Sequence, residues 1–132
     1  MQLNVSTDIA LRTLIYLGRK KELATIQEIA EACHISKAHL MKVVMSLVAN
    51  NLLISERGRN GGVRLALNAT DIQVGAVVRL MENSLALVVC MKEDAVRDGC
   101  PLLPGCRLKG LFIKAQDAFF VTLDQNSLAD IL

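Results

Sequence analysis

Two helix-start signals lie eleven residues apart in the first half of the chain, and they restrict its fold more than any other feature. Thr25 is followed three residues later by Glu28, the spacing of a capping box, in which each side chain accepts from the other residue's backbone N–H. Ser36 is placed to cap a second helix. The apolar positions of that second helix recur every three to four residues: Leu40, Val43, Val44 and Leu47. Two short helices joined by a tight turn predict a helix-turn-helix.

A glycine-rich basic segment directly follows this pair of helices. Residues 52–56 and 63–67 have the apolar and β-branched character of two strands, and the turn between them reads Arg57-Gly58-Arg59-Asn60-Gly61-Gly62. Glycines in such a turn permit positive φ and close backbone approach, whereas its arginines can meet phosphates or enter a minor groove. A hairpin of this kind after a helix-turn-helix is a wing, so the first half of the chain predicts a winged DNA-binding domain.

The turn between the two short helices contains Cys33 and His34. A helix-turn-helix often has glycine at the position of His34, and histidine tolerates a left-handed backbone better than most residues. We therefore expect His34 to be a turn residue rather than a metal ligand. Cys33 is expected to be a small buried residue.

Two further helices are predicted on either side of this domain. Thr7 is expected to cap a first helix, whose apolar positions fall at helical spacing. Thr70 and Gln73 have the spacing of another capping box, and they predict a helix that extends to about Glu82.

A long helix is predicted from just after Cys106 to about Asp124, and Ser127 with Asp130 indicates one last short turn of helix. The apolar positions of the long helix alternate three and four apart: Leu108, Leu111, Ala115, Ala118, Phe119 and Thr122. Such a stripe resembles the seam of a coiled coil. The small domain can cover only part of it, so we expect a second copy of the chain to cover the rest.

Composition and charge narrow the class of protein. The 132-residue chain has no run of 18 apolar residues and no recognisable signal peptide, so an intracellular, cytoplasmic protein without a membrane partner is expected. Residues 1–66 carry nine Lys and Arg against five Asp and Glu, a net charge of +4, whereas residues 67–132 carry six against eight, a net charge of −2. A basic first half favours a polyanionic partner.

Three of the four cysteines lie in one segment of the second half: Cys90, Cys100 and Cys106. In a reducing compartment, clustered cysteines indicate metal ligands or redox sensors more than structural disulfides. Paired C-x2-C knuckles, which structural zinc sites usually use, are absent from the sequence. Soft thiolates on a loop bent by glycine and proline suit an iron–sulfur cluster. Three thiolates would leave one iron of a cubane cluster to another ligand, as a sensor requires.

Other interpretations of the three cysteines stay open at this point. They could be incidental buried thiols, or a pair that oxidises to a disulfide in a cluster-free thiol regulator. A cluster-bearing electron carrier or redox enzyme is a further alternative. The sequence shows neither a paired catalytic acid and base near the loop nor a nucleotide-binding fingerprint, and such a protein would not need a wing. We therefore do not expect an enzyme.

With its wing and cysteine loop together, the chain resembles the winged-helix transcription regulators that carry iron–sulfur clusters. Within that family it is most similar to the nitric-oxide-sensing repressors, and the resemblance covers essentially the whole chain. The matching pieces are Met1-Gln2-Leu3, Thr7-Asp8, Leu11-Arg12, Ile35-Ser36-Lys37, His39-Leu40-Met41-Lys42, Arg57 to Gly62, Cys100, Cys106-Arg107-Leu108-Lys109, Ala118-Phe119, Leu123-Asp124 and Ser127-Leu128-Ala129-Asp130.

The resemblance implies a homodimer that binds double-stranded palindromic operator DNA, with nitric oxide as its effector. It implies that Cys90, Cys100 and Cys106 ligate a 4Fe–4S cluster, and that Asp8 is the fourth ligand, donated across the dimer by the other subunit. Taken alone, Asp8 is also an ordinary first-turn residue favoured by the helix dipole. The nine residues between Cys90 and Cys100 form a long loop for the family, which leaves a 2Fe–2S cluster and an iron-sensing regulator as alternatives.

These inferences give a mainly α protein with a small β wing. A winged helix-turn-helix domain is expected over residues 1–70, and a cluster-binding loop with dimerisation helices over residues 71–132. We predict a repressor whose recognition helix enters a major groove, while Arg57 enters the minor groove and Arg59 and Arg64 meet phosphates. The predicted DNA-binding residues are Ser36, Lys37, His39, Lys42, Arg57, Arg59, Asn60 and Arg64.

Overall fold

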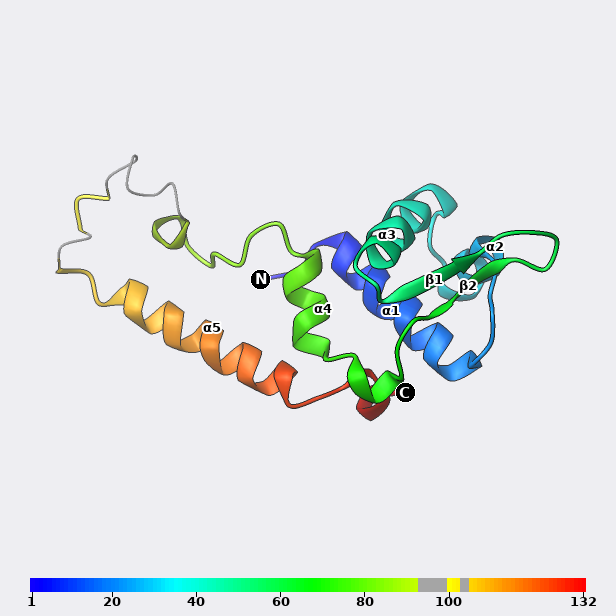
Figure 1. Ribbon diagram of the computed structural model, residues 1–132. Coiled ribbons are helices and arrows are strands. Elements are labelled where there is room, and N and C mark those ends of the chain that lie inside the picture. The colour runs from blue at the N-terminus through cyan, green and yellow to red at the C-terminus, as the bar shows by residue number, and fades with distance from the viewer. Residues whose placement is uncertain (93–99, 103–104) are drawn as a thin grey trace.

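Helices form most of the protein in the computed structural model, which describes residues 1–92, 100–102 and 105–132 (Figure 1). The elements follow in the order α1 (Val5–Lys20), α2 (Ile26–Cys33), α3 (Lys37–Ala49), β1 (Leu53–Glu56), β2 (Gly62–Leu65), η1 (Ala69–Asp71), α4 (Val74–Met81), η2 (Val89–Met91), α5 (Leu108–Asp124) and η5 (Leu128–Ile131), where η denotes a short 3-10 helix. The two strands pair antiparallel. The prediction of a mainly α chain with a small β wing is therefore confirmed.

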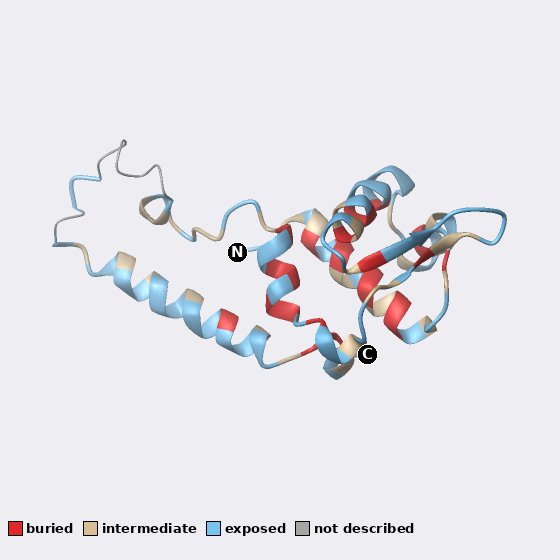
Figure 2. Ribbon diagram, viewed as in Figure 1, coloured by how far each residue is buried: buried red, intermediate tan, exposed pale blue. Residues whose placement is uncertain are grey.

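Helix α1 lies at the centre of the hydrophobic core. It contacts α2, α3, α4, β2 and η5, and its residues Ala10 and Leu14 are completely buried. The buried stripes of α3 and α4 meet this helix, as the red segments of Figure 2 show. Each fully buried leucine or valine contributes about 1.5–3 kcal/mol, so these shared contacts are the main source of stability. The core includes Ile72, Val77 and Leu128, which lie beyond residue 70, and the division into two domains there stays a prediction.

The first helix begins earlier than predicted, because Asn4 rather than Thr7 caps it. The Asn4 side-chain oxygen accepts the Thr7 backbone N–H at 2.8 Å. The carboxylate of Glu82, just past the end of α4, accepts the Asn4 N–H at 2.8 Å and the Thr7 hydroxyl at 2.6 Å. Asn4 also donates to the Met81 carbonyl at 2.8 Å. The first turn of α1 is therefore held by residues almost eighty positions away, which no local pattern could reveal.

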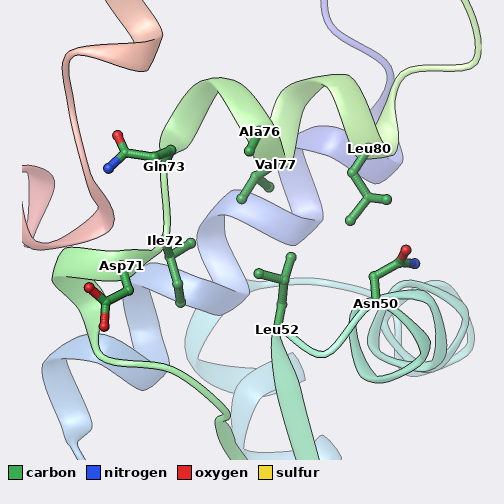
Figure 3. Close-up of a pocket in the computed structure, with 8 residues that line it drawn as sticks. All are labelled: Asn50, Leu52, Asp71, Ile72, Gln73, Ala76, Val77 and Leu80. Atoms are coloured by element: carbon green, nitrogen blue, oxygen red, sulfur yellow. The ribbon is translucent and has the colours of Figure 1, made fainter.

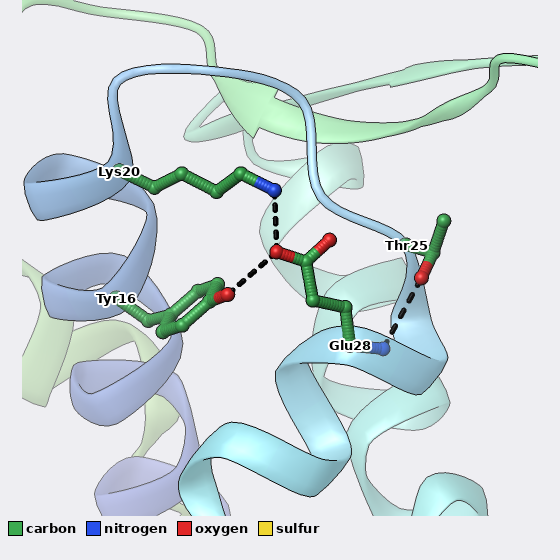
Figure 4. Close-up of polar contacts among 4 residues, drawn as sticks. All are labelled: Tyr16, Lys20, Thr25 and Glu28. Atoms are coloured by element: carbon green, nitrogen blue, oxygen red, sulfur yellow. Dashed lines mark hydrogen bonds and ion pairs between the residues drawn. The ribbon is translucent and has the colours of Figure 1, made fainter.

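The capping box predicted at Thr25 forms only half. The Thr25 hydroxyl accepts the Glu28 backbone N–H at 3.1 Å, as expected. The Glu28 carboxylate instead turns towards α1, where it accepts from the Tyr16 hydroxyl at 2.6 Å and from the Lys20 ammonium group (Figure 4). The Lys20 contact and then the Tyr16 contact hold the pKa of Glu28 below its ordinary value. A cation and a phenol from a neighbouring helix thus outcompete the local N–H, and they join α1 to α2.

The helix predicted from Thr70 begins instead at Val74. Residues Ala69–Asp71 form the 3-10 helix η1, and Ile72 is extended and buried. The backbone around Gln73 forms an antiparallel bridge with Ser127, and the Leu128 N–H donates to the Ile72 carbonyl at 2.7 Å. This pairing with the C-terminal segment requires extended backbone, so it overrides the local capping signal. The predicted last short turn of helix is η5, and Ser127 and Asp130 form a capping box at its start.

Helix α5 leaves the core as an arm, attached near its C-terminal end (Figure 1). Phe120 is its one buried residue among those described, and the Arg79 guanidinium lies 4.1 Å from the centre of the Phe120 ring. Arg79 also makes a bidentate ion pair with Asp124, with N–O distances of 2.6 and 2.7 Å. This pairing lowers the pKa of Asp124 below its ordinary value. A cation on α4 therefore fixes the base of the arm.

Replacing Asp124 by Asn should remove a pH-dependent part of the stability. Because the pKa of the folded-state carboxyl is depressed, its contribution is fully present above the unfolded value of 3.8 and is lost as pH falls through the folded value. The variant should be less stable than the wild type at neutral pH, and the difference should shrink below about pH 4. Urea unfolding at neutral and acidic pH measures this. Asp117→Asn, on the same helix with no ion pair among the described residues, is the matched control; an equal loss in both variants would contradict the expectation.

Candidate functional site

Helix α3 presents a basic outer face. Its N-terminus is capped as predicted, because the Ser36 hydroxyl accepts the His39 backbone N–H at 3.4 Å. The predicted inner stripe is buried, and Leu40 and Leu47 at its centre are fully covered. Lys37, His39 and Lys42 are all exposed on the other side. The helix is therefore placed as a recognition helix would be, with its core face satisfied and its charged face free to meet a ligand.

The turn between α2 and α3 has the conformation predicted from His34. This residue is left-handed, with φ 52° and ψ 48°, and it ends α2 with its side chain exposed. Cys33 is partly buried against the core, and this burial raises the pKa of its thiol. A poorly ionised, partly covered thiol fits the expected structural role of Cys33 better than a reactive one.

The wing is tied to the link between α1 and α2. Ala24 and Val63 exchange two backbone hydrogen bonds of 2.8 and 3.0 Å, which adds a third short segment beside the hairpin. Gly62 lies so close to this segment that a Cβ there would be 2.6 Å from the Ala24 carbonyl oxygen. At the tip, Gly58 has a φ of 113°, a region that other residues rarely adopt. The glycines predicted to shape the wing are therefore needed for its turn and for its docking.

The cations of the wing fall into two groups. Arg57, Arg59 and Asn60 lie in the turn and are exposed. Arg64 lies on β2, where its guanidinium pairs with Glu56 of β1 at 2.7 Å. Both side chains of that pair are about half exposed, so the pair is weak but still reduces the net charge that Arg64 offers to a phosphate. The turn is the more strongly basic part of the wing.

The cysteine segment joins α4 to α5, and its described parts lie at the opposite end of the molecule from the wing (Figure 1). Cys90 lies in η2, Cys100 is exposed, and Cys106 lies two residues before α5. All four cysteines of the chain are free thiols. Residues 93–99 and 103–104, which complete the loop, lie outside the described residues. Three accessible soft donors on one segment fit the chemistry of an iron–sulfur cluster.

Asp8 does not join these cysteines within one chain. It lies exposed in the first turn of α1, where it pairs with Arg12 one turn later. Within residues 1–92, 100–102 and 105–132, no three metal-binding side chains come close enough together to hold an ion. Cys90, Cys100 and Cys106 therefore do not form a ligand set as they stand, and the segment would have to rearrange to bring them together. A fourth ligand would then come from another residue, such as a carboxylate of a second copy.

A shallow pocket of about 300 Å³ lies beside α4, and it offers no catalytic chemistry. Figure 3 shows the residues that line it: Asn50, Leu52, Asp71, Ile72, Gln73, Ala76, Val77 and Leu80. Asp71 is the single ionisable residue in this lining, so an acid and a base are not paired there. Across the described part of the chain, every helix is too short or too polar to cross a lipid bilayer.

Two exposed residues of α3, both methionines, were not predicted from the sequence. Met41 and Met45 leave 48% and 69% of their surface uncovered, although their type alone suggests burial. The helical periodicity could have predicted their exposure, because neither methionine falls on the buried stripe that includes Leu40 and Val44.

Comparison with known proteins gives close relatives over the full length. A family model described as "Rrf2: Iron-dependent Transcriptional regulator" matches residues 3–132. The chain is 44% identical to a protein of Oceanobacillus iheyensis and 40% identical to one of Bacillus subtilis, both named HTH-type transcriptional regulator NsrR. Each alignment spans all of this chain and 90% of the relative.

Solved structures share the fold. IscR of T. potens superposes with a TM-score of 0.78 over 99% of this chain and 85% of that protein, at 22% identity. The oxidised form of Staphylococcus aureus CymR gives a TM-score of 0.77 over 99% and 95% of the two chains, at 26% identity. The predicted arrangement of a winged helix-turn-helix with a long C-terminal helix is thus the arrangement of known regulators.

The sequence relatives and the family match agree with the resemblance noted from the motifs, and they confirm the prediction that the chain is not an enzyme. The chain has a helix-turn-helix followed by a basic wing, and the family model matches nearly all of its residues. It therefore belongs to the Rrf2 family of transcriptional regulators.

Proposed function

We propose that this protein is a DNA-binding repressor whose operator affinity is controlled by nitric oxide through an iron–sulfur cluster. The observation that carries the DNA-binding part is the exposed basic surface formed by α3 and the wing turn. Lys37 and Lys42 extend from the recognition helix, and Arg57 and Arg59 extend from the turn. Four exposed cations on α3 and the wing turn are suited to pair with the phosphates that flank a groove.

The roles of these residues follow from the dimensions of DNA. A major groove about 12 Å wide admits one α-helix, so α3 enters it with Lys37, His39 and Lys42 towards base edges and phosphates. The wing turn extends beyond the helix, and Arg57 enters the adjacent minor groove, where negative potential is enhanced. Arg59 and Asn60 meet the backbone. Arg64 contributes less, since Glu56 already pairs with it.

A second copy of the chain is the partner of α5. Leu111 and Val121 are more than half exposed, and further apolar residues of the helix are left uncovered with them: Leu108, Ile113 and Phe119. Large apolar side chains exposed together on one helix mark an interaction surface, and Figure 2 shows most of the arm in the colour of exposed residues. A symmetric dimer would cover the two arms against each other and would place two α3 helices for a palindromic operator.

The cluster would be held by Cys90, Cys100 and Cys106, with Asp8 of the second copy as fourth ligand. A 4Fe–4S cluster is the form we propose, with 2Fe–2S as the alternative. When bound, the cluster supplies iron that reacts with nitric oxide. The carboxylate of Asp8 would be a hard donor to a soft metal, so it would be the most weakly held of the four ligands. Its nearest partner within the chain is Arg12, which would stabilise the released carboxylate.

Control of DNA binding would then depend on how the ligand residues restrain the two chains relative to each other. With Asp8 engaged by the other subunit, the α1 helix of one chain is fixed to the cysteine segment of its partner. With Asp8 released, the two DNA-binding domains of the dimer would lose that restraint. Because the two states differ in head-to-head geometry, they differ in operator affinity, which is the condition for a switch.

The decisive experiment is an anaerobic titration with nitric oxide. The protein is purified without oxygen, and its visible absorption is followed together with its binding to the promoter of its own gene. We expect absorption and DNA binding to fall together. DNA binding that ignores nitric oxide but follows iron supply would instead favour an iron-sensing regulator. A colourless protein with thiol-dependent DNA binding would favour a disulfide switch.

Replacing Cys100 by Ala should abolish cluster binding without disturbing the fold, because this side chain is exposed. The Cys100→Ala variant, purified without oxygen, should lack visible absorption, and its DNA binding should no longer respond to nitric oxide. Cys33→Ala is the matched control, since Cys33 is also a free thiol but lies at the C-terminal end of α2. The ligand assignment would be wrong if Cys100→Ala kept a full-strength cluster.

Replacing Arg57 by Ala should weaken operator binding by about 1–3 kcal/mol if its guanidinium enters the minor groove. The same change at Arg64 should have a smaller effect, because its ion pair with Glu56 competes with phosphate. Lys114→Ala, on the exposed arm, controls for the loss of one positive charge elsewhere. Fluorescence anisotropy with a labelled operator gives the affinities of the wild type and the three variants, and equal values for Arg57→Ala and wild type would remove Arg57 from the interface.

A further inference from the structure

The outward face of α3 combines cations with an apolar strip. The buried positions Leu40, Val43, Val44 and Leu47 fix which side of the helix meets the core. Residues one turn apart on the opposite side are Ala38, Lys42 and Met45, with Met41 at the flank. All of them are exposed. We define Ala38, Met41 and Met45 as the apolar strip of α3.

The two methionines of this strip require an explanation. Met45 is 69% exposed and Met41 is 48% exposed, and neither belongs to the hydrophobic core or packs at its edge. Large apolar side chains left side by side on a helix mark a contact surface rather than random exposure. Methionine is flexible and polarisable, so it can adapt to an apolar group that the fold itself does not provide.

The charges on the same face identify the class of partner. Lys37 and Lys42 lie within one turn of the strip, and the wing turn adds Arg57 and Arg59. An apolar protein surface would have to desolvate these cations, whereas DNA would pair them with phosphates. In the major groove, the C5 methyl group of thymine is the apolar feature that base edges present. The strip and its cations therefore match a groove that contains thymines.

We propose that Ala38, Met41 and Met45 determine operator specificity by contacting thymine methyl groups, so that each half-site carries thymine opposite this strip. The inference rests on the proposed DNA-binding function and deepens it. A thioether is only a weak hydrogen-bond acceptor, so it gains little from the amino group that cytosine offers at the corresponding edge. Lys42, between Ala38 and Met45, holds the helix to the backbone while the strip discriminates.

The test removes single methyl groups from the DNA. Full-length protein purified without oxygen selects a duplex from a random-sequence library, and each thymine of that duplex is then replaced by deoxyuridine. This change deletes the C5 methyl group and leaves every hydrogen-bonding group in place. Burying one methyl group is worth roughly a fourfold change in affinity, so binding should weaken about fourfold at the contacted thymines in each half-site. Thymines elsewhere should give no change.

Protein variants test whether the sensitive thymines contact the apolar strip of α3. In Met45→Ala or Met41→Ala, the deoxyuridine effect at the contacted thymine should disappear, because its partner is already gone. Leu67→Ala, another exposed large apolar residue, should keep the full effect. The inference is overturned if deoxyuridine is tolerated at all positions, or if its effect persists unchanged in both methionine variants. Failure to select any specific duplex would overturn the proposed DNA-binding function, and this inference with it.

Discussion

The burial of α1 is the constraint on which the rest of the structure depends. This one helix contacts both helices of the helix-turn-helix, the returning strand of the wing, the helix that precedes the cysteine segment and the C-terminal turn. Its central residues Ala10, Thr13 and Leu14 are completely buried. Thr13 satisfies its hydroxyl by donating to the Ile9 carbonyl at 2.8 Å, so even the polar position costs little. Elements distant in sequence therefore share one support, and α1 joins the helix-turn-helix to the helix that precedes the cysteine segment.

The connection between α1 and the cysteine segment is polar and specific. Glu82 accepts hydrogen bonds from Asn4 and Thr7, and it lies directly before the residues that lead to Cys90. Asp8 follows Thr7 in the same turn of α1. The position of the proposed carboxylate ligand and the start of the cysteine segment are thus fixed by a common contact. Any change in the restraint on either one acts on the same end of α1.

Sequence reasoning predicted what depends on local chemistry. The Ser36 cap, the buried stripe with Leu40, the left-handed His34 and the glycines of the wing all follow from the preferences of a few neighbouring residues. It was wrong where a distant group competes for the same atoms. Glu82 accepts the Thr7 hydroxyl while Asn4 caps α1, Lys20 draws Glu28 away from its cap, and Ser127 holds the backbone before α4 extended. These partners are separated in sequence by between eight and seventy-five residues, beyond the reach of a pattern. For the candidate site, spacing identified the donors and the cations, but the exposure of the methionines needed the packing of α3.

The separation of the proposed sensor from the reading head determines how control can act. The described parts of the cysteine segment and the wing lie at opposite ends of the molecule (Figure 1), so an electrostatic influence on Arg57 or Arg59 would be screened over a Debye length of about 8–10 Å. The relative position of the two DNA-binding domains remains as the proposed means of controlling operator affinity. In a dimer on a palindrome, two recognition helices must enter major grooves about 34–36 Å apart, and each is rigidly packed on its own α1. In the proposed dimer, a small rotation of one α1 relative to the partner arm would therefore move an entire DNA-binding domain out of register, and affinity would fall although every proposed contact residue is intact.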